Sequence, residues 1–214
     1  MKVTLSLWDV GGQERFGFFK TDFFRGTAAV GLVFDLSRPD TYEKVEVYVN
    51  DMRERSGNIP IFLVGNKCDL KETVGETISY DKIIRKVNEH NLIGYIETSA
   101  LKDKNVDQLF KNLSLGALFD LKPRLGEIDI NNNNQFRFKI LLIGDAGVGK
   151  SSLIKKFVNK DIDHDYKLTV GLDLMKQEID IPDSEIPKEG FKIINRAISD
   201  YKKKLRHIRR KEKI

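Results

Sequence analysis

The sequence predicts an α/β fold with a mainly parallel sheet, and three observations support this class. Short apolar runs of strand length alternate along the chain with segments of helical periodicity. Two of these runs, 28–34 and 59–64, are nearly continuous, as expected for strands buried on both faces of a parallel sheet. A glycine-rich turn from Gly144 to Ser151 joins a predicted strand to a predicted helix. This order of elements is typical of open α/β sheets covered by helices.

The individual elements follow from apolar periodicity and from the positions of Gly and Pro. Residues 3–8 alternate between apolar and polar side chains, which is typical of a strand. Residues 106–121 place most of their apolar side chains on one side of a helix. The same reasoning predicts further strands at 28–34, 59–64, 94–97, 136–143 and 172–181, and helices at 42–52, 80–89, 150–159 and from about residue 191.

Length and composition indicate one domain with an appendage. The chain has 214 residues, of which 40% are hydrophobic and 32% charged, an ordinary composition for a globular protein. No apolar run is long enough to span a bilayer, and Cys68 is the single cysteine, so we expect a cytoplasmic protein without disulfides. Residues 183–214 hold 11 Lys and Arg and 5 Asp and Glu, a net +6, which leaves −1 for the rest of a chain of +5. This near-neutral body argues against nucleic-acid binding by the body.

The turn from Gly144 to Ser151 has the pattern G-x-x-x-x-G-K-[ST], which binds nucleotide phosphates. Glycines let backbone N–H groups converge on one phosphate, and the following helix adds the dipole of its N-terminus. Lys150 places a positive charge on the β- and γ-phosphates, and Ser151 supplies a hydroxyl oxygen to Mg²⁺. The residues expected to contact the nucleotide here are Asp145, Ala146, Gly147, Val148, Gly149, Lys150, Ser151 and Ser152.

Two further motifs follow predicted strands, at the edge where open α/β sheets bind ligands. They are N-K-C-D at 66–69 and T-S-A at 98–100. An Asp carboxylate accepts hydrogen bonds from N1–H and N2–H₂ of guanine, which adenine does not offer, so it selects guanine. Together with the phosphate loop these motifs predict GTP and GDP as ligands, contacted by Asn66, Lys67, Asp69, Ser99 and Ala100.

The segment W-D-V-G-G-Q-E at 8–14 also follows a predicted strand. Asp9 can hold Mg²⁺ through water, and Gly12 can bring its backbone N–H close to the γ-phosphate. Gln13 has both a donor and an acceptor, so it can orient a water for in-line attack. The segment therefore predicts the residues that act on the γ-phosphate.

These motifs resemble those of the Ras superfamily of small GTPases, with features of Rab and Arf members, over residues 1–121 and 137–182. The resemblance implies a three-layer P-loop NTPase fold with a six-stranded, mostly parallel sheet and one antiparallel edge strand. It also identifies the segment Y-K-L-T-V-G at 166–171 as switch I. There Tyr166 would contact the nucleotide, and Thr169 would bind Mg²⁺ and act in catalysis with Gln13 and Lys150.

The order of these motifs differs from the order in the family that they resemble. The phosphate loop and switch I usually come first, and here they come last, so we expect a circular permutation cut between the switch I strand and the D-x-x-G strand. In the usual fold these two strands form an antiparallel hairpin. The expected domain covers 1–182, with 1–121 and 136–182 joined by an Asn-rich linker at 122–135, and a basic amphipathic helix follows at 183–214. The linker has 14 residues and extends to about 46–50 Å, which is long enough to join the end of 1–121 to the start of 136–182.

By this resemblance the chain is a GTP-hydrolysing switch that uses Mg²⁺. No Arg occurs between 161 and 169, so we expect no arginine finger from switch I, slow intrinsic hydrolysis, and dependence on an activating protein. Exchange proteins and effectors are expected partners as well. Two alternatives stay open: a GTP-binding scaffold with little hydrolysis, favoured by Ala146, and a permuted GTPase that acts on ribosomes or RNA, supported only by the basic tail.

The tail has apolar side chains three and four residues apart from Phe191 to Ile208, with Lys and Arg crowded into its last turns. This pattern fits a helix packed on the body or on another helix, and it also fits peripheral contact of 191–214 with an anionic membrane. Nucleic-acid contact is the weakest interpretation. We expect a monomer, with a domain-swapped dimer as the alternative, because strand pairing does not specify which chain supplies the partner.

Overall fold

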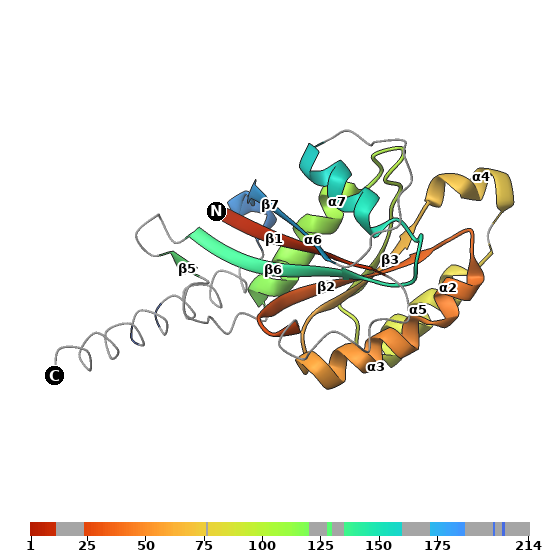
Figure 1. The fold of residues 1–214 in the computed structure, drawn as a ribbon, viewed down its shortest axis with the longest axis horizontal. Helices are drawn as coiled ribbons and strands as arrows, with labels where there is room; N and C mark the ends of the chain where they lie inside the picture. The colour runs from red at the N-terminus through yellow and green to blue at the C-terminus, as the bar shows by residue number, and fades with distance from the viewer. Residues whose placement is uncertain are drawn as a thin grey trace.

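The computed structural model of this chain describes residues 1–11, 24–75, 77–119, 128–129, 135–159, 172–186, 199 and 203. Within these residues one sheet forms the middle layer, and helices lie on both of its faces (Figure 1). The strands follow one another across the sheet in the order β4 (Gly94–Glu97), β3 (Ile61–Asn66), β2 (Thr27–Asp35), β6 (Gln135–Ile143), β1 (Lys2–Val10) and β7 (Leu172–Asp180). A two-residue strand, β5 (Ile128–Asp129), pairs with β6 outside this path.

Strands from the two ends of the sequence lie side by side in this sheet. β6 lies between β2 and β1 and is parallel to both, and β3 is parallel to β2 and to β4. β7 is antiparallel to β1 at the edge, with Lys2 opposite Asp180 and Val10 opposite Leu172. The expected mostly parallel sheet of six strands with an antiparallel edge strand is therefore present. The short antiparallel β5 is an addition that falls inside the predicted linker.

Two groups of helices cover the two faces of the sheet (Figure 1). Phe110 of α6 stacks on Phe157 of α7, with ring centroids 4.1 Å apart, so these two helices share one core. Tyr42, Val49 and Ile83 belong to the core on the opposite face. The helices of the first group are α6 (Val106–Phe119) and α7 (Lys150–Asn159), and those of the second are α2 (Pro39–Glu43), α3 (Val45–Ser56) and α5 (Tyr80–Glu89).

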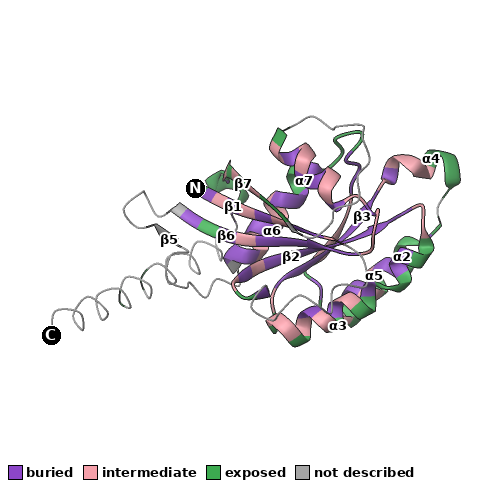
Figure 2. Ribbon diagram, in the orientation of Figure 1, coloured by how far each residue is buried: buried purple, intermediate pink, exposed green. Residues whose placement is uncertain are grey.

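The central strands β2 and β3 are buried along almost their whole length (Figure 2). Neighbouring residues of β2 enter opposite cores, since Val33 packs with the α6 side and Phe34 with the α3 side. This two-sided burial explains the continuous apolar runs in the sequence. In the part of the chain that the structure describes, no helix is long and apolar enough to cross a membrane.

Several element bounds differ from the prediction. The helix expected at 42–52 is divided into α2 and α3, and α2 begins earlier because Pro39 is favourable in a first helical turn. β3 is shifted to 61–66, because Gly65 and Asn66 still pair with the end of β2. The remaining short elements are η2 (Cys68–Leu70), α4 (Lys71–Val74) and η3 (Asp183–Glu185), and none of them was predicted.

Some predicted features lie outside the described residues. These are Gly12 and Gln13, the switch I residues Tyr166 and Thr169, most of the linker at 122–135, and the helix expected from about residue 191.

Candidate functional site

The phosphate-loop sequence follows β6 directly and leads into α7, whose first residue is Lys150. Gly144, Gly147 and Gly149 all have positive φ angles, of 137°, 72° and 97°. This conformation disfavours side chains with a Cβ, so these glycines are needed for the tight path of the loop. At Gly149 an added Cβ would also collide with the Nδ2 atom of Asn66. The loop and the strand that ends at Asn66 are therefore packed together without spare room.

Lys150 is buried at the centre of this loop. Its Nζ atom donates hydrogen bonds to the carbonyl oxygens of Gly144, at 2.9 Å, and Asp145, at 2.8 Å. Burial lowers the pKa of Lys150 to about 8, against the opposing effect of the Asp9 and Asp145 charges. A buried cation of lowered pKa favours an anionic ligand beside it, because the anion stabilises the charged form. The position of Lys150 thus suits a phosphate group.

Two residues predicted to hold Mg²⁺ meet beside the loop. The hydroxyl of Ser151, in the first turn of α7, donates a hydrogen bond to Oδ2 of Asp9 near the end of β1. Asp9 is 3% exposed. A carboxylate and a hydroxyl oxygen are suitable ligands for a hard cation such as Mg²⁺. Among the described residues no group of three or more His, Cys, Asp or Glu could hold a metal, so these two oxygens would share the ion with other ligands.

Asn66 connects the two predicted base-binding motifs with the phosphate loop. Its Nδ2 atom donates to the carbonyl oxygen of Val148 at 2.8 Å, and its Oδ1 atom accepts from the hydroxyl of Thr98 at 3.1 Å. The amide of Cys68 donates to the carbonyl oxygen of Thr98 at 3.0 Å. Asn66 and Thr98 are almost completely buried. Three separate motifs are thus held at the same edge of the sheet.

The other predicted base-binding residues follow Asn66 and Thr98 in the sequence. Lys67 has a left-handed conformation, with φ of 62°, and Asp69 lies in the 3₁₀ turn that follows. Ser99 and Ala100 are buried beyond the end of β4. The structure therefore brings together the predicted residues Asp9, Asn66, Lys67, Asp69, Ser99, Ala100, Asp145, Ala146, Gly147, Val148, Gly149, Lys150, Ser151 and Ser152, whereas Gly12, Gln13, Tyr166 and Thr169 lie outside the described residues.

Three charged residues at this edge are not among the predicted site residues. Asp35 ends β2, and its Oδ2 atom lies 2.7 Å from Nζ of Lys67. Arg38 donates to the carbonyl oxygen of Ala146 at 2.9 Å, and Lys44 pairs with Asp145 at 2.6 Å. These contacts join residues 32 to 108 positions apart, and no local motif in the sequence marks them.

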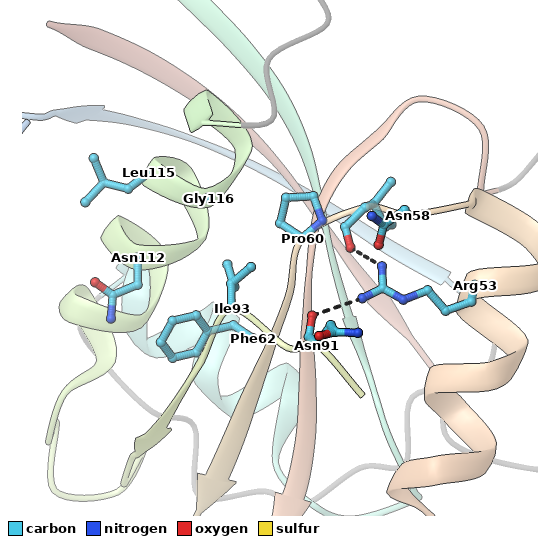
Figure 3. A pocket seen from close by; sticks show the side chains of 10 residues that line it. Arg53, Asn58, Pro60, Phe62, Asn91, Ile93, Asn112, Leu115 and Gly116 are labelled. Carbon is cyan, nitrogen blue, oxygen red and sulfur yellow. Dashed lines mark hydrogen bonds between the residues drawn. The ribbon is translucent and has the colours of Figure 1, made fainter. Parts of the chain in front are cut away.

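A pocket of about 550 Å³ lies at the opposite end of the sheet, before the first residues of β3 and β4 (Figure 3). Arg53 borders it and donates to the carbonyl oxygens of Ile59, at 2.5 Å, and Asn91, at 3.4 Å. None of the predicted site residues lines this pocket. It is therefore separate from the edge where the motifs gather.

Comparison with known proteins gives matches on both halves of the chain. A family model described as Ras family matches residues 1–117, and one described as "Ras of Complex, Roc, domain of DAPkinase" matches residues 139–200. Ras-related protein rab-11.1 of Caenorhabditis elegans is 38% identical over 112 residues, which are 52% of each chain. Ras-related protein Rab-11A of Dictyostelium discoideum is 36% identical over 112 residues, 52% of this chain and 51% of the relative.

Ras-related protein Rab-13 of Bos taurus is 30% identical over 135 residues, 63% of each chain. The chain thus spans about half the length of the first curated relatives that it matches. The Ras family match itself covers more than half of the chain and includes β1 to β4 with the N-K-x-D and S-A motifs. On this match, the chain belongs to the Ras family.

Proposed function

We propose that this chain is a guanine-nucleotide switch that binds GTP and GDP with Mg²⁺ and slowly hydrolyses GTP to GDP and phosphate. The observation that carries the proposal is the pair of hydrogen bonds made by Asn66, to Val148 and from Thr98. They join the phosphate loop, the N-K-x-D motif and the T-S-A motif, which are the parts needed for the phosphates and for guanine. Membership of the Ras family supports the same function.

Each residue has a defined task in this proposal. Lys150 and the backbone N–H groups of 145–151 bind the phosphates, while Asp69, held beside Asn66, accepts from guanine. Asp9, Ser151 and Thr169 would hold Mg²⁺, which when bound neutralises charge on the β- and γ-phosphates. Gln13 orients the attacking water, next to the backbone N–H of Gly12.

We further propose that the domain is circularly permuted and that one chain supplies the whole site. Parallel pairing of β1 with β6 and antiparallel pairing of β1 with β7 support this, because they give early and late segments one common sheet. The two family matches lie on either side of residues 118–138 and agree with a joint in that region. The permuted domain would cover 1–182, with 122–135 as the joint.

Regulators, effectors and the tail complete the proposal. Activating and exchange proteins would set the nucleotide state, as the slow intrinsic rate requires. Residues 183–214 would form the basic helix and contact either the domain, a partner or an anionic membrane. The body would act without nucleic acid and as a monomer.

Single-turnover hydrolysis of GTP tests the proposal. Purified protein is loaded with GTP, Mg²⁺ is added, and the bound nucleotide is separated by HPLC over time. We expect slow conversion of GTP to GDP that fails in Gln13→Leu, because the variant cannot orient the water. GTP that persists in the wild type would favour the scaffold function, and failure of the wild type to retain either nucleotide would contradict the proposal.

A further inference from the structure

Asp35 is a fully buried carboxylate at the end of β2, between the base-binding motif and the phosphate loop. Its Oδ1 atom accepts hydrogen bonds from the backbone N–H and the hydroxyl of Ser37, at 2.9 and 2.6 Å. Its Oδ2 atom lies 2.7 Å from Nζ of Lys67 and 3.1 Å from Nε of Arg38. Both oxygens are thus occupied, and two cations from different elements share one of them.

Arg38 carries this contact on to the phosphate loop. While Nε donates to Asp35, Nη2 donates to the carbonyl oxygen of Ala146 at 2.9 Å. The planar guanidinium can make both bonds at once because its donors point in fixed, different directions. A continuous path therefore runs from Lys67 through Asp35 and Arg38 to Ala146.

The charges on this path favour its persistence. Burial opposes ionisation of Asp35, but hydrogen bonds from Lys67 and Ser37 and the charge of Lys67 outweigh it and hold the pKa of Asp35 below its ordinary value. Asp35 therefore stays anionic at neutral pH. Because its carboxylate is fully buried, salt screens these contacts less than it screens ion pairs on the surface.

We propose that Asp35 and Arg38 are positioning residues that hold the base-binding turn and the phosphate loop in one fixed arrangement and thereby slow the release of guanine nucleotide. This inference rests on the proposed function. A nucleotide that touches Asp69 at one end and Lys150 at the other is retained only while the two loops keep their separation. Asp35 lies 115 residues before Lys150 in the sequence, yet it contacts the base-binding turn directly through Lys67 and the phosphate loop through Arg38.

The experiment measures release of a fluorescent GDP analogue in the presence of Mg²⁺ from the full chain. The variants are Asp35→Asn, Arg38→Gln, Arg38→Lys and the double variant Asp35→Asn/Arg38→Gln. Lys82→Gln is the matched control, since Lys82 forms an exposed ion pair with Glu43 and has no contact with either loop. Arg38→Gln keeps the test valid if Asp35→Asn does not fold, because the Arg38 side chain is 41% exposed.

We expect nucleotide release to accelerate about tenfold in Asp35→Asn and about three- to tenfold in Arg38→Gln. Changes of this size correspond to the loss of a hydrogen bond to a charged group. The double variant should release little faster than Asp35→Asn alone, because both changes break the same path. Arg38→Lys should not restore the wild-type rate, since a single ammonium cannot bond both Asp35 and Ala146. Release rates of the single variants equal to that of Lys82→Gln, or full rescue by Arg38→Lys, would overturn the inference.

Amide hydrogen exchange of residues 144–149 in nucleotide-free protein separates this inference from the proposed function. Faster exchange in Arg38→Gln than in Lys82→Gln supports the positioning role even if the wild type retains no guanine nucleotide, in which case only the proposed function fails. Equal exchange in the two variants contradicts the positioning role.

Discussion

Asn66 donates a hydrogen bond of 2.8 Å to the carbonyl oxygen of Val148, which lies 82 residues later in the sequence. The donor ends β3 and the acceptor lies in the phosphate loop after β6. β2 separates these two strands in the sheet, so the bond passes across the end of β2. The same edge therefore holds both loops, and its disruption should affect folding and nucleotide binding together.

Replacement of Asn66 by Ala should destabilise the protein and weaken GDP binding. The change leaves the buried Val148 carbonyl and Thr98 hydroxyl without this partner, at a cost of about 1–3 kcal/mol for each unsatisfied group. Urea unfolding and a GDP titration measure the two effects. Asn112→Ala is the control, since it removes one bond from Gln108 on the surface and should change stability by less than about 0.5 kcal/mol. Equal stability of the two variants would contradict the role of Asn66.

Gly149→Ala should be more harmful than Gly57→Ala, although both glycines have positive φ, of 97° and 72°. At Gly57 a Cβ meets nothing within 4 Å, so only backbone strain of about 1–3 kcal/mol is expected. At Gly149 the Cβ also displaces the Asn66 side chain and with it the contact to Val148. Thermal unfolding and retained GDP compare the variants. If Gly149→Ala and Gly57→Ala lose the same thermal stability and retain the same amount of GDP, the close contact at Gly149 has no effect.

The lowered pKa of Lys150 predicts proton uptake when GDP binds above about pH 8. Without nucleotide, Lys150 loses its proton near pH 8, and phosphates restore the charged form. GDP affinity should therefore fall as the pH rises above about 8. In the nucleotide-free protein the same group makes stability increase between about pH 8 and 10.4, because the unfolded chain then binds more protons.

Calorimetric titration with GDP in buffers of different ionisation enthalpy measures this uptake. We expect a substantial fraction of a proton at about pH 8.5 and almost none at about pH 7. Lys139→Met is the control. Burial also lowers the pKa of Lys139 to about 8, but its ammonium lies 3.8 Å from the centre of the Trp8 ring and not in the phosphate loop. This variant should therefore take up the same fraction of a proton as the wild type. Uptake that is the same at both pH values would contradict the assignment to Lys150.

Removal of Mg²⁺ by EDTA should accelerate GDP release from the wild type about tenfold or more, since the cation neutralises phosphate charge. Ser151→Ala should show a smaller acceleration, because it has already lost the hydroxyl that lies against Asp9. Ser114→Ala should respond like the wild type, since the hydroxyl of Ser114 bonds to Phe110 within α6. A response of Ser151→Ala equal to that of Ser114→Ala would argue against a metal at Asp9 and Ser151.

Features encoded in short stretches of sequence were predictable. The phosphate loop is contiguous, so its pattern fixed the end of β6 and the whole of α7, which begins at Lys150 as expected. The strand at 94–97 and the helix at 80–89 also match the predicted bounds. The end of β3 did not match, because apolar periodicity does not show that Gly65 and Asn66 continue the ladder.

Contacts between distant segments were not predictable from local patterns. The bond from Arg38 to Ala146 spans 108 residues and depends on β2 lying next to β6 in the sheet. The ion pair of Asp35 with Lys67 likewise requires the ends of β2 and β3 to be neighbours. Such contacts depend on the order of the strands in the sheet. From a single sequence that order can be predicted only by resemblance to a family of known fold.

Native mass spectrometry of the purified chain tests the central claim most directly, that one permuted chain forms a complete guanine-nucleotide site. The account predicts a monomer whose mass exceeds that of the chain by one GDP or GTP. A monomer without nucleotide that gains none after incubation with GDP and Mg²⁺, or nucleotide found only on a dimer, would contradict it.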